Sequence, residues 1–535
     1  MVSEVEWEWV NFTSSWRQLE WPPKQKFASS AFLIDDHKSL EDTPGDVIRE
    51  CYNDGFASLF SQADEQLSLA NKKLHTFPFK DVEPCWFRLY TDASLAKALN
   101  IIESIENCSE NAALHQSLSG RLDEIVTILD MALIMAGGLG REEIIHQVLM
   151  KLKSSSDARQ EVVEPPSKRR RLEEPDRDER LLPETLPSDE ISIPKLQFPV
   201  QHMKQPSMTA FARSMQEDRT PVIMTGVLDH WPALEKWQHV TYWLDQTFDG
   251  RRLVPIEVGR SYTDEDWGQR IVPFREFLNT FILQQPDSPA RAMGQEHTET
   301  GYLAQHDLLR QIPALRADIA TPDYCFLDAP PPDPGTPVAL NKAKKGLADK
   351  TSHPSLIPST TSSLHHRNKD DDDDDDDQEV QTNIWYGPAW TISPLHHDPY
   401  HNILCQVVGK KYIRLYSPRH SASLFPRPAD EPAPHLVQFN GDKHRNGDTS
   451  QPEVEPKSTV AEACEETIDM SNTSTIDVAA MEISPHEDWD EVYPGLSKVA
   501  YLECILEAGQ ALYIPIGWWH YVRSCSVGIS VSFWW

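Results

Sequence analysis

Paired cysteines are missing from this sequence of 535 residues. The eight cysteines are scattered along the chain, with no C-x-x-C pair and none of the spacings that bind structural zinc. Disulfides persist in oxidising compartments and are rare where glutathione keeps thiols reduced. We therefore expect free thiols in a reducing compartment rather than a disulfide framework.

Long hydrophobic runs are missing as well. The most apolar stretch, IVTILDMALIMAGGLG at 125–140, is too short to span a bilayer and contains Asp130. The first residues, MVSEVEWEWVNF, are acidic and lack the basic and then apolar layout of a secretory signal. We therefore expect no membrane association and no secretion, and hence a soluble intracellular protein.

Positive charge is scarce, since 50 Lys and Arg residues face 83 Asp and Glu residues, for a formal net charge of −33. This excess repels phosphate backbones, so we expect no direct nucleic-acid binding and basic proteins as partners. One basic cluster, KRRR at 168–171, stands between prolines and acidic residues in PPSKRRRLEE. It is either an ordinary solvated linker or a nuclear import signal, and we favour the signal. A nuclear location is therefore predicted, with the cytoplasm as a second compartment and chromatin-associated proteins among the partners.

The N-terminal part has a helical pattern. Apolar residues recur at spacings of three and four from about residue 45 to 155, which predicts an all-helical domain over residues 1–160. Trp86, Phe87 and Leu89 are expected in its core rather than at a binding site. No chemical motif accompanies this pattern.

The C-terminal part has a different character. Residues 161–195 are dense in Pro, Ser and charge, which predicts a disordered linker that contains the basic cluster. In residues 196–535, short runs rich in β-branched and aromatic residues are bounded by Pro and Gly, chiefly at 383–417 and 499–535. Several short strands of this kind predict a β-sandwich or barrel, and the whole chain an α+β protein.

Two acidic or low-complexity stretches interrupt the β pattern. Residues 328–378, which include the aspartate run 370–377, and residues 441–484 have few apolar side chains. Such segments cannot repay the entropy of folding, so we expect disordered loop insertions in both places. The aspartate run could attract a basic substrate, but a charge run is more often simply solvated.

The stretch SPLHHDPYHN, residues 393–402, concentrates possible metal ligands. In an extended segment, residues two apart point the same way, so His396 and Asp398 project together while His397 faces the other side. One imidazole and one carboxylate supply two thirds of the 2-His-1-carboxylate arrangement found in non-haem Fe(II) oxygenases. On its own, H-x-D is a weak signal.

A third ligand has to come from elsewhere in the sequence. His520 lies in GQALYIPIGWWHYVRS, where one strand is expected to stop at Pro515 and the next to begin near the histidine. His401 would have to fold back on its own segment, so we expect it outside the ligand set or at the surface. The remaining histidines of the low-complexity and loop regions are expected to be solvated: His365, His366, His435 and His444.

A lone cation follows on the next expected strand, VVGKKYIRLYS. There Lys411 shares one face with Ile413 and Leu415. A buried ammonium needs an anionic partner, whereas a lysine at a strand start can also reach solvent through its flexible stem. Both alternatives remain open from the residues alone.

A family resemblance runs through seven blocks of residues 196–535. They are RRLVPIEVGRSYTDEDW, GYLAQHDLL, TPDYCFLD, NIWYGP, TISPLHHDPYHNILCQVVGKKYIRLYSP, YIPIGWWHYVRS and SVSFWW. Together they resemble the jumonji-C oxygenases, and among these the subgroup called jumonji-C domain protein five or lysine demethylase eight. The resemblance implies a double-stranded β-helix, a cupin-like jelly roll, for the C-terminal half.

The resemblance also implies roles for individual residues. His396, Asp398 and His520 would bind Fe(II). Five residues would bind the co-substrate 2-oxoglutarate, with Lys411 holding its distal carboxylate: Tyr302, Ser393, Asn402, Lys411 and Trp534. The implied reaction consumes O2, releases succinate and CO2, and hydroxylates a C–H bond of a protein side chain.

The implied substrate is a protein arginine. Glu257 in VPIEVGR would face the arginine, and Trp385 in NIWYGP would stack on its guanidinium. Without the resemblance we would favour a surface carboxylate and a core tryptophan. His397 and Tyr400 occupy positions that vary in the family. Because of the acidic insertion before Trp385, the identity of the family's substrate carries over to this chain less well than the reaction chemistry does.

Three alternatives stay open. Histone methyl-lysine demethylation uses the same iron chemistry, although no aromatic cage is identifiable from the sequence. A non-catalytic nuclear scaffold of the same fold is a second, and the intact set of His396, Asp398, His520 and Lys411 argues against it. A zinc-bound cupin is a third, because two histidines and a carboxylate also suit zinc.

Overall fold

The chain is described here from a computed structural model. The described residues are 59, 61–75, 82–106, 114–163, 182–191, 193–263, 267–283, 300–348, 380–429, 431–432 and 467–535. The basic cluster, the aspartate run and the four histidines expected to be solvated lie outside these ranges. Among the described helices, none is both long enough and apolar enough to cross a membrane.

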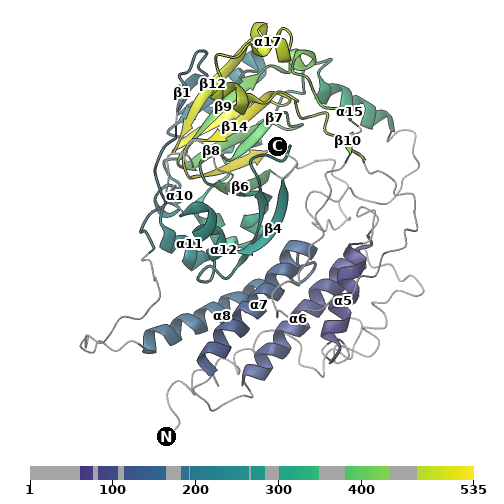
Figure 1. Cartoon of the computed structure of the whole chain (residues 1–535), viewed down its shortest axis with the longest axis vertical. Helices are drawn as coiled ribbons and strands as arrows, with labels where there is room; N and C mark the ends of the chain where they lie inside the picture. The colour runs from purple at the N-terminus through teal and green to yellow at the C-terminus, as the bar shows by residue number, and fades with distance from the viewer. Residues whose placement is uncertain are drawn as a thin grey trace, which may run out of the picture.

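Four long helices form the N-terminal part and lie together at one end of the molecule (Figure 1). They are α5 (Ala63–Leu74), α6 (Pro84–Glu106), α7 (Leu114–Ala136) and α8 (Glu142–Val163). Leu89 is buried in their core, and Trp86 and Phe87 pack against it half-buried. The helical pattern of the sequence is therefore confirmed where the chain is described, and α8 extends slightly beyond the expected boundary.

The C-terminal part is built on two large β-sheets. The nine-stranded sheet has the order β1 (Gln201–Lys204), β2 (Val222–Thr225), β13 (Gln510–Ile514), β8 (Asn402–Val408), β15 (Gly528–Trp534), β6 (Gln381–Gly387), β5 (Gly301–His306), β3 (Leu253–Val258), β4 (Gly268–Pro273). The four-stranded sheet has the order β12 (Tyr501–Glu507), β9 (Lys410–Tyr416), β14 (Trp519–Ser524), β7 (Ile392–His396). A small two-stranded sheet pairs β10 (Glu431–Pro432) with β11 (Thr467–Ile468).

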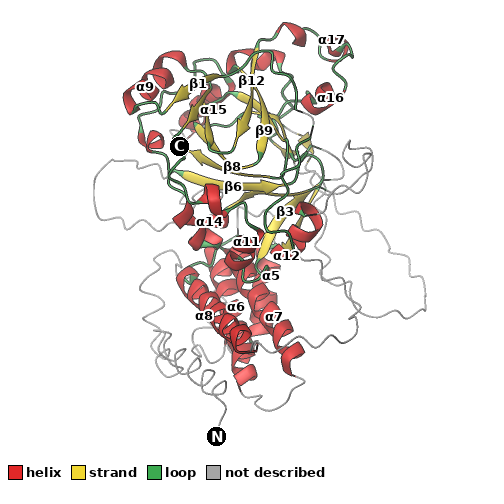
Figure 2. Ribbon diagram, turned by 90° about the vertical axis from the view of Figure 1, so that its left-hand side faces the viewer, coloured by secondary structure: helices red, strands yellow, loops and turns green. Residues whose placement is uncertain are grey.

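Short helices connect and cover these strands. The α-helices are α9 (Met208–Arg213), α10 (Ala233–Lys236), α11 (Val240–Gln246), α12 (Phe274–Phe277), α14 (Leu308–Gln311), α15 (Pro337–Ala348), α16 (Val478–Ile483) and α17 (Trp489–Val492). The 3-10 turns are η4 (Pro313–Asp318), η5 (Asp323–Phe326), η6 (Pro418–Ser423) and η7 (Leu496–Lys498), and the π turns are η2 (Ser214–Asp218) and η3 (Leu278–Ile282). In both views α11 and α12 lie between the long helices and the sheets (Figure 2).

The alternation of side chains along the strands separates two cores. On β8, Ile403 and Cys405 belong to the cluster that packs against the short helices, whereas Leu404 belongs to a cluster shared with the four-stranded sheet. Because the side-chain period of a strand is two, the nine-stranded sheet has one face toward the helices and one toward the other sheet. This is the jelly roll expected from the sequence.

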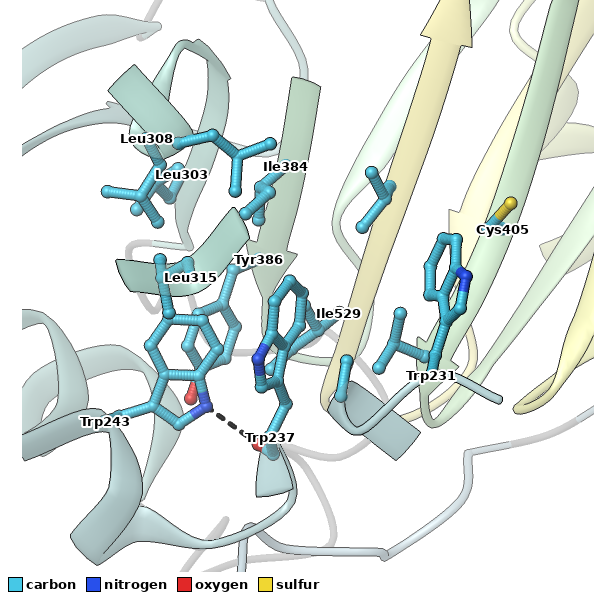
Figure 3. Packing of buried hydrophobic residues seen from close by; sticks show 14 of the residues in the cluster. Trp231, Trp237, Trp243, Leu303, Leu308, Leu315, Ile384, Tyr386, Cys405 and Ile529 are labelled. Atoms are coloured by element: carbon cyan, nitrogen blue, oxygen red, sulfur yellow. Dashed lines mark hydrogen bonds between the residues drawn. The ribbon is translucent and has the colours of Figure 1, made fainter. Parts of the chain in front are cut away.

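The helix-facing core is rich in tryptophan (Figure 3). Trp237 and Trp243 contact each other edge to face, and the Trp243 indole Nε1 donates a hydrogen bond of 2.7 Å to the Trp237 carbonyl oxygen. Tyr386 of β6 packs against Trp243 with ring centroids 5.1 Å apart. Large aromatic rings with a satisfied polar atom therefore anchor the helices to the sheet.

The expected insertion at 328–378 is wrong at its beginning, because α15 forms within it. Asp333 accepts hydrogen bonds from Arg219 Nη1 at 2.8 Å and from Arg419 Nε at 3.0 Å. Val338 of α15 is 3 % exposed and lies beside Gly517. One ion-pair cluster and one buried valine thus order a stretch whose composition alone predicted disorder.

The expected insertion at 441–484 is wrong at its end for a similar reason. Ile476, Val478 and Ala479 are buried against the four-stranded sheet. The backbone N–H of Ser474 donates to the Leu395 carbonyl oxygen at 2.8 Å. The segment therefore packs on the β-domain, although its few apolar residues did not stand out from the polar sequence around them.

The expected linker at 161–195 is also shorter than its composition predicts. Leu186 is buried in the tryptophan-rich core, and its N–H donates to the Gln238 carbonyl oxygen at 2.8 Å. The N–H of Ile191 donates to Cys525 O, also at 2.8 Å. This proline-rich stretch is thus anchored on the β-domain by single apolar side chains and backbone hydrogen bonds.

Candidate active site

Two histidines and one aspartate converge where β7 ends and β14 begins. His396 pairs with His520 in the antiparallel register of these strands, and Asp398 follows two residues after the end of β7. Asp398 Oδ1 lies 3.9 Å from His396 Nε2, and Asp398 Oδ2 lies 3.6 Å from His520 Nε2. One ligand atom from each of the three residues lies within 4.8 Å of the others, a spacing that fits a single metal ion.

The backbone orients both imidazole rings. His396 Nδ1 donates to the Pro394 carbonyl oxygen at 2.7 Å, and His520 Nδ1 donates to the Trp518 carbonyl oxygen at 3.0 Å. Each ring therefore has its Nδ1 occupied by a backbone carbonyl and its Nε2 turned toward Asp398, which leaves Nε2 as the atom that would bind a metal. Burial and the neighbouring His396 lower the pKa of His520 to about 4, so this ring is neutral near pH 7.

The other histidines of the stretch lie outside this group. His397 is buried and packs edge-on against Trp519 at 4.6 Å, on the opposite side of the strand, as the two-residue period predicts. His401 is buried too, with Nε2 donating to the Pro330 carbonyl oxygen at 2.9 Å and Nδ1 2.8 Å from the Tyr513 hydroxyl. A surface position for His401 is thus wrong, because the chain end and the 330 region cover it.

A glycine turn forms a backbone hydrogen bond to Asp398. Gly517, between β13 and β14, donates its backbone N–H to the Asp398 carbonyl oxygen at 3.0 Å. Its φ of +78° lies in the region that favours glycine. The same turn leads directly into His520, so two of the three ligand residues are tied to one backbone feature.

Sequence reasoning missed a polar wall beside His396. Thr473 forms an isolated bridge with His396, and the Asn472 carbonyl oxygen accepts the His397 N–H at 2.9 Å. Tyr262 reaches this wall through its hydroxyl, 3.5 Å from Thr473 Oγ1. A polar turn before an aspartate helix cap, in SNTSTIDVAA, is the only signal of the wall in the sequence.

Lys411 lies on the face of β9 that is turned toward the other sheet. Ile413 and Leu415, two and four residues further, belong to the core between the sheets, and Leu415 pairs with His520. Lys411 is 2 % exposed, so the solvent-reaching alternative is wrong. Its Nζ donates to the Tyr302 hydroxyl at 3.2 Å, and no carboxylate forms an ion pair with it among the described residues. Burial lowers the pKa of Lys411 to about 7, as expected for a cation that lacks an anion.

Asn402 and Trp534 lie side by side in the nine-stranded sheet, paired in the register of β8 and β15. Asn402 is 5 % exposed, and within the described part of the chain neither its Oδ1 nor the Trp534 Nε1 has a hydrogen-bond partner. Ser393 pairs with Val522, whose side chain belongs to the core between the sheets. All three residues thus lie on strands that bound the space between the sheets, and Asn402 and Trp534 have polar atoms left for a ligand.

Glu257 lies on the same inner side. It pairs with Tyr302 in the register of β3 and β5, while its neighbours Ile256 and Val258 face the helices. Burial raises the pKa of Glu257 to about 7, and the nearby Trp267 indole opposes this only in part. A surface carboxylate is therefore the wrong interpretation of this residue.

A row of aromatic rings extends from Tyr302. Its ring centroid lies 6.0 Å from that of Trp385, which lies 6.4 Å from that of Trp534, which in turn stacks on Tyr400 at 6.1 Å. The Trp385 Nε1 donates to Ser532 Oγ at 2.9 Å, which holds the indole in place. Trp385 is thus half-buried between the sheets rather than a helix-facing core residue.

The residues between the two sheets fit a metal ion together with a small dicarboxylate. Two imidazoles and a carboxylate leave coordination positions open for further ligands, unlike a closed structural site. The buried Lys411 ammonium, the Tyr302 hydroxyl and the unpaired Trp534 indole N–H provide donors for a small dicarboxylate. The arrangement fits iron together with 2-oxoglutarate.

Comparison with known proteins agrees with this geometry. The profile of the cupin-like domain family matches residues 208–535. The chain is 31 % identical over 501 residues to Lysine-specific demethylase JMJ30 of Arabidopsis thaliana, covering 89 % of this chain and 86 % of the relative. It is 30 % identical over 487 residues to Lysine-specific demethylase 8 of Danio rerio, with 89 % and 90 % covered. A more distant relative is the human Bifunctional peptidase and (3S)-lysyl hydroxylase JMJD7, 23 % identical with 62 % and 82 % covered.

Proposed function

Since the chain belongs to the cupin-like jumonji-C family of 2-oxoglutarate-dependent oxygenases, we propose that it hydroxylates arginine side chains of protein substrates. His396, Asp398 and His520 would hold Fe(II), which together with 2-oxoglutarate and O2 supplies the oxidising power for C–H hydroxylation. The products besides the hydroxylated side chain are succinate and CO2.

The chain's own residues would bind and orient the reactants. The Lys411 ammonium and the Tyr302 hydroxyl would hold the distal carboxylate of 2-oxoglutarate. Asn402 and Ser393 would contact the co-substrate between this anchor and the metal, and Trp534 would shield it from water. Loss of the co-substrate would leave the ammonium buried and without an anion, so the two are matched in charge.

One observation carries the choice of arginine. Glu257 is a half-buried carboxylate with a raised pKa, and its strand partner Tyr302 begins the row of rings that contains Trp385. A planar guanidinium satisfies both features at once, because it pairs with a carboxylate and stacks on an indole. A cation at this place would restore the ionised form of Glu257 near pH 7.

The partner proposal follows from charge. A chain of net charge −33 attracts basic proteins, and an arginine substrate is by nature basic. We propose nuclear, chromatin-associated proteins as the first substrates to examine, because the basic cluster at 168–171 suits an import signal. Direct binding to nucleic acid or to membranes is not part of this proposal.

Methyl-lysine demethylation is the second candidate. Its support is the names of the two relatives aligned over most of their length, both lysine-specific demethylases, together with the aromatic rings of Tyr302, Trp385 and Trp534. Aromatic rings also bind methylated ammonium groups. The arginine proposal accounts in addition for the raised pKa of Glu257.

Mass spectrometry of peptides after reaction separates the two candidates. The full-length protein is incubated with Fe(II), 2-oxoglutarate and a library of basic histone peptides, each made with arginine, with lysine and with methyl-lysine at the test position. We expect a gain of one oxygen, about 16 mass units, on arginine peptides and none on the lysine versions. Loss of methyl groups from methyl-lysine, with arginine unchanged, would replace the proposal with demethylation.

Two further outcomes address the remaining alternatives. Anaerobic titration that detects no Fe(II)-dependent binding of 2-oxoglutarate would favour a non-catalytic scaffold. Activity restored by Fe(II) after chelation, but not by Zn²⁺, would exclude a zinc-bound cupin. We expect Fe(II) to restore succinate production.

A further inference from the structure

Asp130 is a charged residue in the middle of the most apolar stretch of the helical domain. It lies on α7, and its side chain is completely buried. A buried carboxylate is costly unless it is paired and hydrogen-bonded. Among the residues that the structure describes, its hydrogen-bond partners lie in the β-domain.

Asp130 binds the residues that begin β3. Arg252 donates from Nη2 to Asp130 Oδ1 at 2.7 Å and from Nε to both carboxylate oxygens at 2.8 and 2.9 Å. The backbone N–H of Leu253, the first residue of β3, donates to Asp130 Oδ2 at 2.7 Å. A helix carboxylate thus holds both the side chain and the main chain at the start of this strand.

Gln311 of α14 extends the network to β5. Its Nε2 donates to Asp130 Oδ1 at 3.0 Å and to the Leu253 carbonyl oxygen at 2.8 Å. These two acceptors fix the amide orientation, so Oε1 must accept from His306 Nε2, 2.6 Å away. Burial lowers the pKa of His306, which keeps this ring neutral with its proton on Nε2. The Gln311 carbonyl oxygen also accepts from Arg252 Nη2 at 2.8 Å.

The two strands held in this way carry site residues. β3 begins at Leu253 and contains Glu257; β5 ends at His306 and contains Tyr302. Glu257 and Tyr302 face each other in the strand register, and Tyr302 contacts Lys411. Strands β7 and β14, which carry the metal-binding histidines, belong to the other sheet and have no contact with Asp130 among the hydrogen bonds of the described residues.

We infer that Asp130 is a positioning residue through which the helical domain sets the placement of Tyr302 and Glu257, and with it the affinity for 2-oxoglutarate and for the substrate cation. This inference rests on the proposed function for the identity of the ligands. It gives the helical domain, which offers no chemical motif of its own, a direct part in the site. The metal ligands lie outside its influence.

Other contacts between the two parts of the molecule serve as a comparison. Lys153 of α8 forms an ion pair of 2.6 Å with Asp245 of α11, with side chains 28 % and 57 % exposed. This ion pair joins the helical domain to α11 and not to β3 or β5. Lys153→Ala is therefore the matched control, since it removes an interdomain contact without touching the Asp130 network.

The test uses the full chain and three variants: Asp130→Asn, Gln311→Met and Lys153→Ala. Calorimetry measures the dissociation constant of Mn²⁺, a redox-inert substitute for Fe(II), and then that of 2-oxoglutarate in its presence. We expect Asp130→Asn and Gln311→Met to weaken 2-oxoglutarate binding about tenfold, within the usual range of coupling between sites, while Mn²⁺ binding changes by less than about twofold. Lys153→Ala should change neither.

Hydrogen exchange supplies a readout that does not depend on the ligand. Amides of residues 253–258 and 301–306 should exchange about tenfold faster in both network variants, with β7 and β14 unchanged. Gln311→Met leaves the Asp130–Arg252 pair intact, so it decides the matter if Asp130→Asn fails to fold.

Three results would overturn the inference. The first is that Asp130→Asn and Gln311→Met bind 2-oxoglutarate as tightly as Lys153→Ala does. The second is that these two variants lose affinity for Mn²⁺ and for 2-oxoglutarate to the same extent. The third is that amide exchange in β3 and β5 stays unchanged in both variants. If the unmodified protein binds no 2-oxoglutarate, the proposed function fails, whereas the exchange measurement still decides whether Asp130 positions these strands.

Discussion

The two sheets of the β-domain contribute different parts of the candidate site. The four-stranded sheet provides His396 and His520 from neighbouring strands, together with Lys411. The nine-stranded sheet provides Glu257 and Tyr302 near one edge and, further inward, the residues Trp385, Asn402 and Trp534. The metal ligands thus come from one strand pair of the four-stranded sheet and the turn after β7, whereas most residues that face the co-substrate and the substrate come from the nine-stranded sheet.

This difference teaches how reaction type and specificity can be separated in one fold. A metal site needs three atoms at one point, which a strand pair and a following turn supply with little help. Recognition of a side chain needs groups spread over a wider surface, and β3 and β5 depend on Asp130 of the helical domain for their anchoring. Variants at the metal ligands should therefore affect a different binding step from variants at β3 and β5.

The largest effect is expected at the metal. Asp398→Ala removes the carboxylate that lies between the two imidazoles, and it should lower metal affinity and turnover by about 100-fold or more, since loss of mere outer-shell partners already costs 10–100-fold. Mn²⁺ titration and succinate release measure this. The control is His397→Leu, whose side chain faces away; a loss of metal affinity equal to that of Asp398→Ala would refute the ligand assignment.

The next effect concerns the co-substrate anchor on the same sheet. Lys411→Met keeps the buried volume and removes the charge, so the dissociation constant of 2-oxoglutarate should rise by about 10- to 100-fold, as expected for a lost hydrogen bond to a charged group. Mn²⁺ affinity should stay the same. Calorimetry checks both values. Unchanged 2-oxoglutarate binding would mean that the ammonium has another role.

A smaller effect should appear in the nine-stranded sheet. Glu257→Gln retains the shape but not the charge, so the KM for an arginine peptide should rise about tenfold through the loss of one charge-assisted pair. The metal dissociation constant should not respond. Peptide kinetics followed by mass spectrometry measures this change. An unaltered KM would place the substrate guanidinium elsewhere and remove the main support for arginine.

The smallest effect is a pH dependence. Burial lowers the pKa of Lys411 to about 7, so the charged form is present below that pH and is lost as the pH rises through it. From pH 7 to pH 8 the protonated fraction falls from about one half to about one eleventh, which should weaken 2-oxoglutarate binding about fivefold with proton uptake on binding. Calorimetry in buffers of different ionisation enthalpy measures the uptake. A flat profile in the unmodified protein, or the same slope in Lys411→Met, would contradict this.

Much of the fold was predictable because its signals are local. Helical spacing in the N-terminal part and β-branched runs in the C-terminal part correspond to the observed elements. The insertions and the linker were drawn too long, because composition does not reveal a single anchor such as Val338 or Leu186. A few buried side chains decide order in a segment that is otherwise polar.

The candidate site likewise contains residues that the sequence predicted and residues that it did not. The two-residue period of a strand selected His396 with Asp398 and set His397 aside, and the strand start at His520 marked the third ligand. Residues on the polar wall, Tyr262 and Thr473, were not foreseen, since nothing in their local sequence distinguishes them from an ordinary turn.

The sequence by itself determined the class of each half, the ligand chemistry and the alternation that directs side chains inward, because these depend on residue type and short-range period. The tertiary structure alone decided that Lys411 is buried, with no anionic partner in the described part of the chain, and that Glu257 lies opposite Tyr302. It also decided that Asp130 binds β3 across the boundary between the two parts. Burial and partnership depend on segments far apart in the chain, and only packing brings those segments together.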